Sequence, residues 1–249
     1  MSLKLDSVNR AARISVAMPF ILVLSSSVAF FACAAKSLPA HEAKPGASTP
    51  RSVEIDEYRG EKLGAIADFN DNSIKGVQRI DRDAYRLAVG GLVSKPLSLA
   101  YEELLALPRA ERVVTLNCVE GWSVRVYWEG FRLSELLDRA EVAGSATTLI
   151  LYAADGYSTT IPLADARAKD MLVAYRMNGL ELPPERGFPL QLVAEDKWGY
   201  KWIKWIERID LSVESDFRGY WEERGYNQKG DYDGPRFEEG PEKIDAARN

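Results

Sequence analysis

The chain has 249 residues, of which 46% are hydrophobic and 28% charged, and its formal net charge is −5. This composition is typical of a globular protein, and its acidic balance argues against general nucleic-acid binding, which needs a basic surface to displace counterions from phosphates. The single histidine, His41, lies in a Pro- and Ala-rich segment. The sequence therefore argues against a Ser-His-Asp triad, a Cys-His dyad, a His-ligated zinc site and a histidine-held haem.

The first predicted element is an export or anchoring segment. An uncharged stretch over residues 14–32 follows three basic residues, Lys4, Arg10 and Arg13, and is long enough to span a bilayer. Three fates are open: lipid attachment at Cys33, cleavage by an ordinary signal peptidase, or retention as a single membrane anchor. Each places the rest of the chain outside the cytoplasm, on the periplasmic side of the membrane, anchored by a helix or a lipid, or secreted.

Composition shifts divide the chain into four predicted parts: a signal or membrane anchor (1–36), a flexible linker rich in Pro, Ala, Ser and Gly (37–52), one folded domain (53–213) and a polar C-terminal extension (214–249). The aromatic part of the extension, 214–226, is expected to pack on the domain because Tyr and Trp at that density are costly in water. Residues 231–249 are expected to be mobile.

Within the domain, short strand-like runs alternate with turn signals, which predicts a mixed, strand-rich α+β fold with a few short helices. The predicted strands cover 85–89, 113–116, 148–152 and 188–193. Helices are predicted over 101–107, with Ser98 as the N-cap and Pro108 after its end, and over 133–140.

Cys118 follows the strand-like run 113–116 and is the only cysteine outside the N-terminal segment. If Cys33 is lipidated or removed, Cys118 has no intramolecular partner in an oxidising compartment. Such a cysteine is either an inert buried thiol or a soft ligand and nucleophile. The residue alone leaves both readings open.

A cluster of lysines and tryptophans at 197–206 interleaves cations with flat rings around Gly199. This pattern suits an anionic ligand that carries a planar heterocycle, because ammonium groups bind phosphate and the backbone at glycine can approach closely. The lysines also fall at helical spacing, so a solvated helix face is the alternative. Gly199 and the apolar pattern over 205–211 favour a turn that leads into a strand.

These residues together resemble the molybdopterin-binding domain of the sulfite oxidase family, especially its compact bacterial branch, which includes the catalytic subunit of periplasmic methionine sulfoxide reductase. The resemblance runs from about residue 85 to 226 through a series of motifs in the same order: 91–99, 117–123, 128–131, 175–179, 182–189 and 199–205. It implies a sulfite-oxidase-type fold, in agreement with the α+β class above.

The resemblance also implies a molybdenum-molybdopterin cofactor. Cys118 would be the thiolate ligand of the metal, a role that suits a soft donor. Lys204 would hold the pterin phosphate together with the backbone of its two preceding residues. Tyr157, which alone is readily explained as a loop anchor after Asp-Gly, corresponds to an active-site tyrosine. The residues expected to bind the cofactor are Asn72, Arg186, Lys201, Trp202, Ile203 and Lys204.

Two departures from the family pattern concern the site. Gln191 stands where members commonly carry an arginine that contacts the cofactor, and residues 119–122 replace an arginine pair that binds oxyanion substrates in sulfite oxidases. Arg125 is the candidate substitute for that pair. The haem and dimerisation domains of larger members are not expected, so the chain should carry no haem and should exchange electrons with a separate cytochrome or membrane redox subunit.

The leading hypothesis is an exported or membrane-attached molybdenum oxidoreductase that moves one oxygen atom to or from a small sulfite-like or sulfoxide-like substrate. A non-catalytic exported binding or scaffold domain with the same fold is the alternative. A single-stranded nucleic-acid binder that uses the Lys/Trp cluster is a third reading. The acidic remainder of the chain argues against it, and no nucleic-acid partner is expected.

Overall fold

The structure is a computed structural model that describes residues 53–238. The expected export segment and linker, with Cys33 and His41, lie outside the described residues, as do residues 239–249. Within the described range, no helix is both long enough and apolar enough to cross a membrane.

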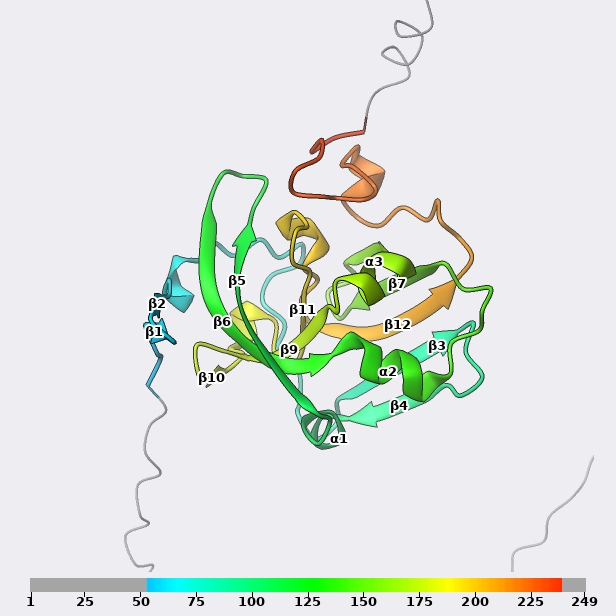
Figure 1. The fold of residues 1–249 in the computed structure, drawn as a ribbon, viewed down its shortest axis with the longest axis horizontal. Helices are drawn as coiled ribbons and strands as arrows, with labels where there is room; N and C mark the ends of the chain where they lie inside the picture. Colours follow the sequence, from blue (N-terminus) through cyan, green and yellow to red (C-terminus); the bar gives the residue numbers. More distant parts are fainter. Residues whose placement is uncertain (1–52, 239–249) are drawn as a thin grey trace, which may run out of the picture. The chain divides into compact units, whose positions relative to one another are not determined.

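One sheet contributes residues of β5 and β11 to the candidate site. Its strands run in the order β10-β9-β6-β5, all neighbours antiparallel, and β11 pairs with β9 at one end (Figure 1). The strands are β5 (Arg109–Asn117), β6 (Ser123–Arg132), β9 (Leu172–Met177), β10 (Leu180–Glu181) and β11 (Gln191–Val193).

A second sheet has the order β4-β3-β12-β7-β8, in which β12 and β3 are parallel and the other pairs antiparallel. Its strands are β3 (Arg86–Gly91), β4 (Leu97–Ala100), β7 (Thr148–Ala153), β8 (Ser158–Pro162) and β12 (Ile206–Ser212). A small hairpin near the start of the domain joins β1 (Glu57–Tyr58) to β2 (Glu61–Lys62).

Short helices connect the strands. They are α1 (Tyr101–Leu105), α2 (Leu133–Ala140) and α3 (Leu163–Ala168), with single 3-10 turns η1 (Ile66–Asp68), η2 (Pro184–Arg186), η3 (Gly199–Lys201) and η4 (Glu222–Arg224). The helix α2 buries its leucines and contacts both β3 and β6, so it bridges the two sheets. The prediction of a mixed, strand-rich α+β fold is confirmed.

The predicted N-cap of the first helix is wrong. Ser98 lies within β4, where it pairs with Ala88 of β3, and the N-cap of α1 is Ala100. The backbone N–H of Ala100 donates to the Glu103 carboxylate at 2.8 Å, so a glutamate in the first turn supplies the capping interaction that serine was expected to make. The sheet register therefore overrides the local capping signal.

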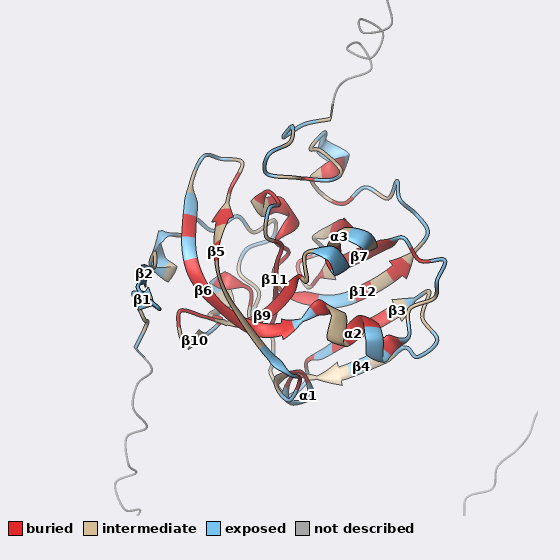
Figure 2. Cartoon of the chain, viewed as in Figure 1, coloured by how far each residue is buried: buried red, intermediate tan, exposed pale blue. Residues whose placement is uncertain are grey.

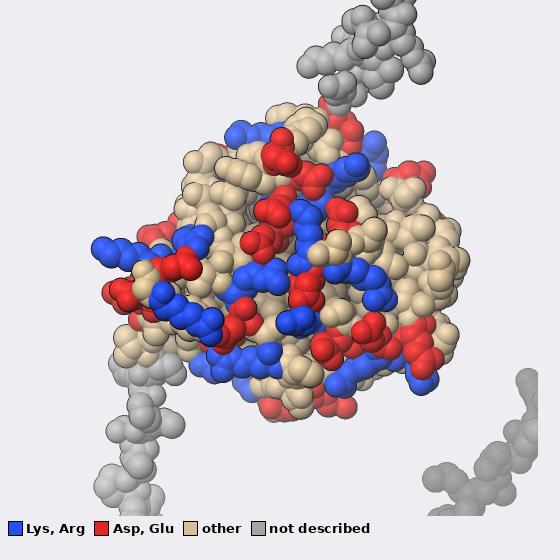
Figure 3. Space-filling model, viewed as in Figure 1, with Lys and Arg blue, Asp and Glu red and all other residues tan. Residues whose placement is uncertain are grey.

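Buried side chains follow the strands of both sheets and form one continuous core (Figure 2). The fully buried side chains include Trp128 and Phe131 of β6, Leu149 of β7 and Ile209 of β12. The surface shown in Figure 3 places lysine and arginine beside aspartate and glutamate, in agreement with many ion pairs between neighbouring side chains. The core thus holds the two sheets in place, and the site lies where their loops meet.

We call residues 214–238 the C-terminal strap; in Figure 1 it is the orange to red segment that follows β12. The strap packs on the domain: Tyr220 N–H donates to the Ser158 carbonyl at 3.0 Å, and Trp198 N–H donates to the Gly230 carbonyl at 2.7 Å. Within the segment expected to be mobile, Asp231 forms a 2.6 Å ion pair with the buried Lys197.

Candidate functional site

A cleft of about 900 Å³, counting the part open to solvent, collects residues from distant parts of the chain. The expected site residues that line it are Asn72, Cys118, Tyr157, Arg186, Trp202, Ile203 and Lys204. The structure therefore brings together most of the residues that were singled out in the sequence.

Cys118 begins the loop between β5 and β6. Its N–H donates to the Trp122 carbonyl at 2.9 Å, and Gly121, with φ of 93°, closes the turn in a conformation that favours glycine. The thiol is 7% exposed, and the Asn72 amide donates to its sulfur at 3.6 Å. Cys118 is thus a buried free thiol that faces a cleft and has a polar neighbour.

Burial raises the pKa of the Cys118 thiol above its ordinary value, although the backbone N–H groups of Glu120 and Val119 and the Asn72 amide act in the opposite direction. Without a ligand the sulfur therefore stays protonated at neutral pH. A metal that binds the thiolate would have to displace this proton, as is general for cysteine ligands.

Two cations, Arg186 and Lys204, line another part of the cleft. Arg186 donates to the Asn70 carbonyl at 3.1 Å, and Lys204 lies 3.2 Å from an Asp71 carboxylate oxygen. Gly187 permits this packing, because a Cβ at that position would lie 2.9 Å from the Cβ of Lys204. The two cations share one nearby carboxylate, that of Asp71, so this part of the cleft suits an anion.

The pKa values of both cations are lowered, in each case chiefly by burial. The positive charge of Arg186 lowers the pKa of Lys204 further, while Asp71 opposes the shift. Burial acts to raise the pKa of Asp71, but the charge and hydrogen bond of Lys204 outweigh it and the net shift is downward. A bound phosphate would relieve the repulsion between the two cations.

The backbone beside Lys204 offers a further donor. Ile203 N–H donates to no backbone carbonyl among residues 53–238, whereas Trp202 N–H donates to the Gly199 carbonyl at 3.0 Å. Of the backbone of residues 202 and 203, expected to help hold a phosphate, the N–H of Trp202 thus already has a partner within η3. Trp202 still lines the cleft.

Tyr157 follows the turn between β7 and β8, and its hydroxyl donates to the Tyr200 carbonyl. Burial raises its pKa well above the ordinary value, and the negative charge of Glu222 raises it further. The hydroxyl therefore remains neutral, so Tyr157 can donate a hydrogen bond but does not serve as a base near neutral pH.

Lys201, which was expected to bind the cofactor, does not lie at the cleft. Its side chain has 0% exposure, pairs with Glu222 of the strap and donates to the Thr160 carbonyl at 3.1 Å. Lys201 does not line the cleft, unlike Lys204 three residues later. Lys201 is the last residue of η3 and points into the protein, whereas Lys204 follows the turn and points toward the cleft.

Arg125, which was expected to bind the substrate, also lies away from the cleft. Val124 and Val126 on β6 point into the core, with exposures of 4% and 0%. Side chains alternate along a strand, so Arg125 points to the opposite face, where it pairs with Glu61. It does not line the cleft, so Arg125 does not replace the missing arginine pair there.

We therefore expect Arg125→Ala to leave molybdenum content and kcat/KM within about threefold of wild type and stability within about 0.5 kcal/mol, because it removes a partly exposed ion pair. Metal analysis, steady-state kinetics and urea unfolding check this. A loss of catalytic efficiency much larger than threefold with normal metal content would show that Arg125 does contribute to the site.

Several cleft residues were not assigned to the site from the sequence: Phe69, Glu120, Trp122, Gly199, Tyr200, Trp221 and Tyr226. Trp221 and Tyr226 belong to the C-terminal strap, and the aromatic density of 214–226 was the signal that could have indicated them. Gln191 also lines the cleft, with 4% exposure, and offers an amide where the family resemblance leads one to expect a cation.

Comparison with known protein families matches the chain to the family described as "Oxidoreductase molybdopterin binding domain", over residues 74–221. The uncharacterised oxidoreductase YuiH of Bacillus subtilis is 38% identical over 152 residues, which is 61% of this chain and 76% of that protein. The catalytic subunit MsrP of the protein-methionine-sulfoxide reductase of Campylobacter jejuni is 30% identical over 206 residues, covering 74% and 69% of the two chains.

A putative protein-methionine-sulfoxide reductase subunit of Azospira oryzae, YedZ1, is 35% identical over 151 residues, which is 61% of this chain and 57% of that protein. Among solved structures, the sulfane dehydrogenase SoxCD of Paracoccus pantotrophus matches with a TM-score of 0.54 and 26% identity. The match covers 56% of this chain and 41% of the SoxCD chain, so it extends over less than half of that larger protein.

Proposed function

Because the chain belongs to the family of oxidoreductases that bind molybdopterin, we propose that it uses a molybdenum-molybdopterin cofactor to move one oxygen atom between a small sulfur compound and water. The observation that carries this proposal is the meeting of one buried thiol, Cys118, and two cations, Arg186 and Lys204, in a single cleft. A thiolate suits the metal and the cations suit the phosphate of the pterin.

The residues present fit this cofactor. Cys118 would hold the metal, and the Asn72 amide at 3.6 Å from its sulfur would orient it. Lys204, Arg186 and the free N–H of Ile203 would hold the phosphate. When bound, the cofactor supplies the two-electron chemistry of the metal. The chain contributes binding, orientation and exclusion of water.

Tyr157 would donate a hydrogen bond inside the cleft rather than accept a proton, because its raised pKa keeps the hydroxyl neutral. Its partner in the structure is the Tyr200 carbonyl, which also lies at the cleft wall. Transfer of this hydrogen bond to a substrate oxygen would polarise that oxygen and favour its departure as water after protonation.

We infer that the reaction runs as reduction of a sulfoxide rather than oxidation of sulfite. Beside Cys118 the cleft presents Glu120 and Trp122, and Arg125 lies on the other face of β6. A doubly charged anion would meet a carboxylate there, whereas a neutral sulfoxide would meet an aromatic wall. The names of two relatives, which refer to methionine sulfoxide reductase, support the same direction.

We propose further that the domain acts outside the cytoplasm, attached through its N-terminal segment, and receives electrons from a separate redox protein at the membrane. The uncharged stretch over 14–32 after a basic start supports export. The word subunit in the names of two relatives supports a separate partner.

The experiment that tests the proposal compares two reactions of the purified protein. With a reduced viologen as electron donor, dimethyl sulfoxide should be converted to dimethyl sulfide, consuming two electrons and two protons and releasing water. With ferricyanide as acceptor, sulfite oxidation should be much slower. The reverse preference would overturn the inferred direction, and the absence of both reactions in molybdenum-loaded protein would overturn the proposed function.

Lys204→Glu should lower cofactor affinity by at least about tenfold, because it replaces a charge-assisted hydrogen bond with repulsion of the phosphate. Molybdenum and pterin content per chain measure the effect. Lys229→Glu is the matched control, since Lys229 is an exposed strap residue outside the cleft. Unchanged cofactor content in Lys204→Glu would contradict the phosphate role.

A further inference from the structure

The C-terminal strap contributes part of the cleft wall. Trp221 and Tyr226 both line the cleft and are only half-buried, so they stand at its open side, whereas Cys118 is 7% exposed. Their ring centres are 5.2 Å apart, and the ring of Tyr226 lies 5.2 Å from that of Tyr200. The strap thus extends the aromatic surface of the domain across the opening.

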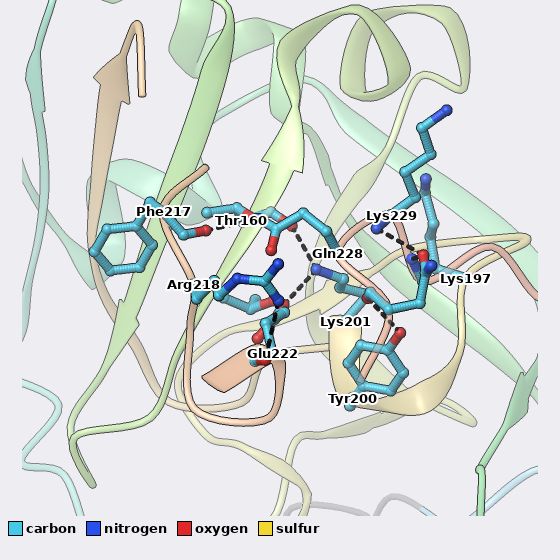
Figure 4. A network of polar contacts seen from close by, with 12 residues as sticks. Thr160, Lys197, Tyr200, Lys201, Phe217, Arg218, Glu222, Gln228 and Lys229 are labelled. Carbon is cyan, nitrogen blue, oxygen red and sulfur yellow. Dashed lines mark hydrogen bonds and ion pairs between the residues drawn. The ribbon is translucent and has the colours of Figure 1, made fainter. Parts of the chain in front are cut away.

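Buried polar contacts fix the strap in place (Figure 4). Glu222, next to Trp221, pairs with Lys201 with both side chains at 0% exposure, and Thr159 donates to the same carboxylate at 2.6 Å. The Gln228 amide donates to Thr160 at 2.8 Å and to the Phe217 carbonyl at 2.6 Å. These contacts anchor the strap next to Trp221 and close to Tyr226, and the two rings pack on each other and that of Tyr226 on Tyr200, so Trp221 and Tyr226 form a preorganised wall.

The strap also reaches the loop that carries the thiol. Arg236 donates to the carbonyl of Val119, the residue after Cys118, at 3.1 Å. The next residue, Phe237, packs on Tyr226 with ring centres 4.8 Å apart. The strap therefore links the aromatic wall to the loop of Cys118, and the cations Arg186 and Lys204 contact the 70–71 segment, next to Asn72, whose amide donates to the Cys118 sulfur.

The geometry points to Trp221 and Tyr226 as specificity-determining residues: they restrict access to Cys118 by size and favour small, neutral, apolar sulfur compounds over bulky or charged ones. This inference rests on the proposed function and adds to it the part of the chain that selects the substrate. Flat rings accommodate methyl groups, and a wall fixed by buried contacts does not widen for a larger substituent.

The kinetic test uses full-length holoenzyme and the variants Trp221→Ala and Tyr226→Ala. The kcat/KM ratio of methyl phenyl sulfoxide to dimethyl sulfoxide, with a reduced viologen as donor, should rise by at least about tenfold in Trp221→Ala, with a smaller rise in Tyr226→Ala. Tyr232→Ala is the matched control, because Tyr232 is a strap aromatic outside the cleft and should leave the ratio unchanged. An unchanged ratio in both cleft variants overturns the inference.

A second measurement does not depend on catalysis. It uses full-length protein from a host that makes no molybdopterin. Cys118 is alkylated at alkaline pH with iodoacetamide or with a pyrene maleimide, and mass spectrometry measures the rate of each reaction. The rate ratio of the large to the small reagent should rise several-fold in Trp221→Ala and stay constant in Tyr232→Ala. Constancy in Trp221→Ala, or in Trp221→Leu if the alanine variant is unfolded, overturns the inference.

These two measurements separate the inference from the proposed function. If wild-type holoenzyme reduces neither sulfoxide, the proposed function fails, and the alkylation ratios alone decide whether the strap restricts access. If wild type reduces dimethyl sulfoxide but neither measurement responds to loss of Trp221, the function stands and the inference fails.

Discussion

Replacement of Cys118 by serine should abolish molybdenum binding at the metal position and reduce sulfoxide reduction to background. The serine hydroxyl is a harder and far less acidic donor than a thiol, and it would lie in the same buried position, 7% exposed, where burial already raises the pKa of the native thiol. Metal analysis and steady-state kinetics of the purified variant measure the two effects.

The control for this variant is Cys33→Ser, which changes the other cysteine of the chain. It should retain molybdenum and activity, because residue 33 belongs to the expected export segment. A Cys118→Ser protein that keeps full metal content and activity would contradict the ligand role, whatever the behaviour of the control.

Glu222→Gln should lower the free energy of unfolding by about 3 to 5 kcal/mol, because it leaves the ammonium group of Lys201 buried without a counter-charge. Both side chains have 0% exposure, so water cannot compensate for the loss. Urea unfolding at neutral pH measures the change. The strap should also detach more readily, which limited proteolysis within 214–238 would show.

The stability difference between Glu222→Gln and wild type should also depend on pH. Burial lowers the pKa of Lys201 below its ordinary value of 10.5, and Glu222 opposes that shift. Without Glu222 the folded state binds this proton less well than the unfolded state does, so stability rises with pH. The difference between Glu222→Gln and wild type should therefore shrink as the pH rises from neutral toward that value.

The matched double variant Lys201→Met, Glu222→Leu should recover most of the lost stability, since it removes both charges and retains similar volume. A single variant with wild-type stability would contradict the account of the buried pair. Equal losses of stability in the single and double variants would show that packing at this position, rather than an unpaired charge, accounts for the lower free energy of unfolding.

Much of the fold could be predicted from local patterns. The helix at 133–140 was predicted with the bounds that α2 has, because its leucines recur at helical spacing. The turn into a strand after Gly199 was also favoured correctly and corresponds to η3 and β12. By contrast, β6, the longest strand, was missed because charged residues and a glycine interrupt its apolar pattern.

The site was predicted less completely, for two physical reasons. Lys201 and Lys204 are equivalent in the sequence, and only the fold shows that Lys201 pairs with Glu222, a residue of the strap. Arg125 differs, because the valines on either side of it are a local signal, not used in the prediction, for a strand whose arginine faces away from the core. Partners that are distant in sequence thus limited the prediction more than local structure did.

We propose that Cys118, Arg186 and Lys204 form one molybdopterin site. The most direct test is molybdenum and pterin analysis of wild-type protein purified aerobically from a host that makes the cofactor. We expect one molybdenum and one pterin per chain. Protein that is folded but contains neither would contradict it, and would favour the alternative of a scaffold domain in which Gln191 marks the loss of cofactor binding.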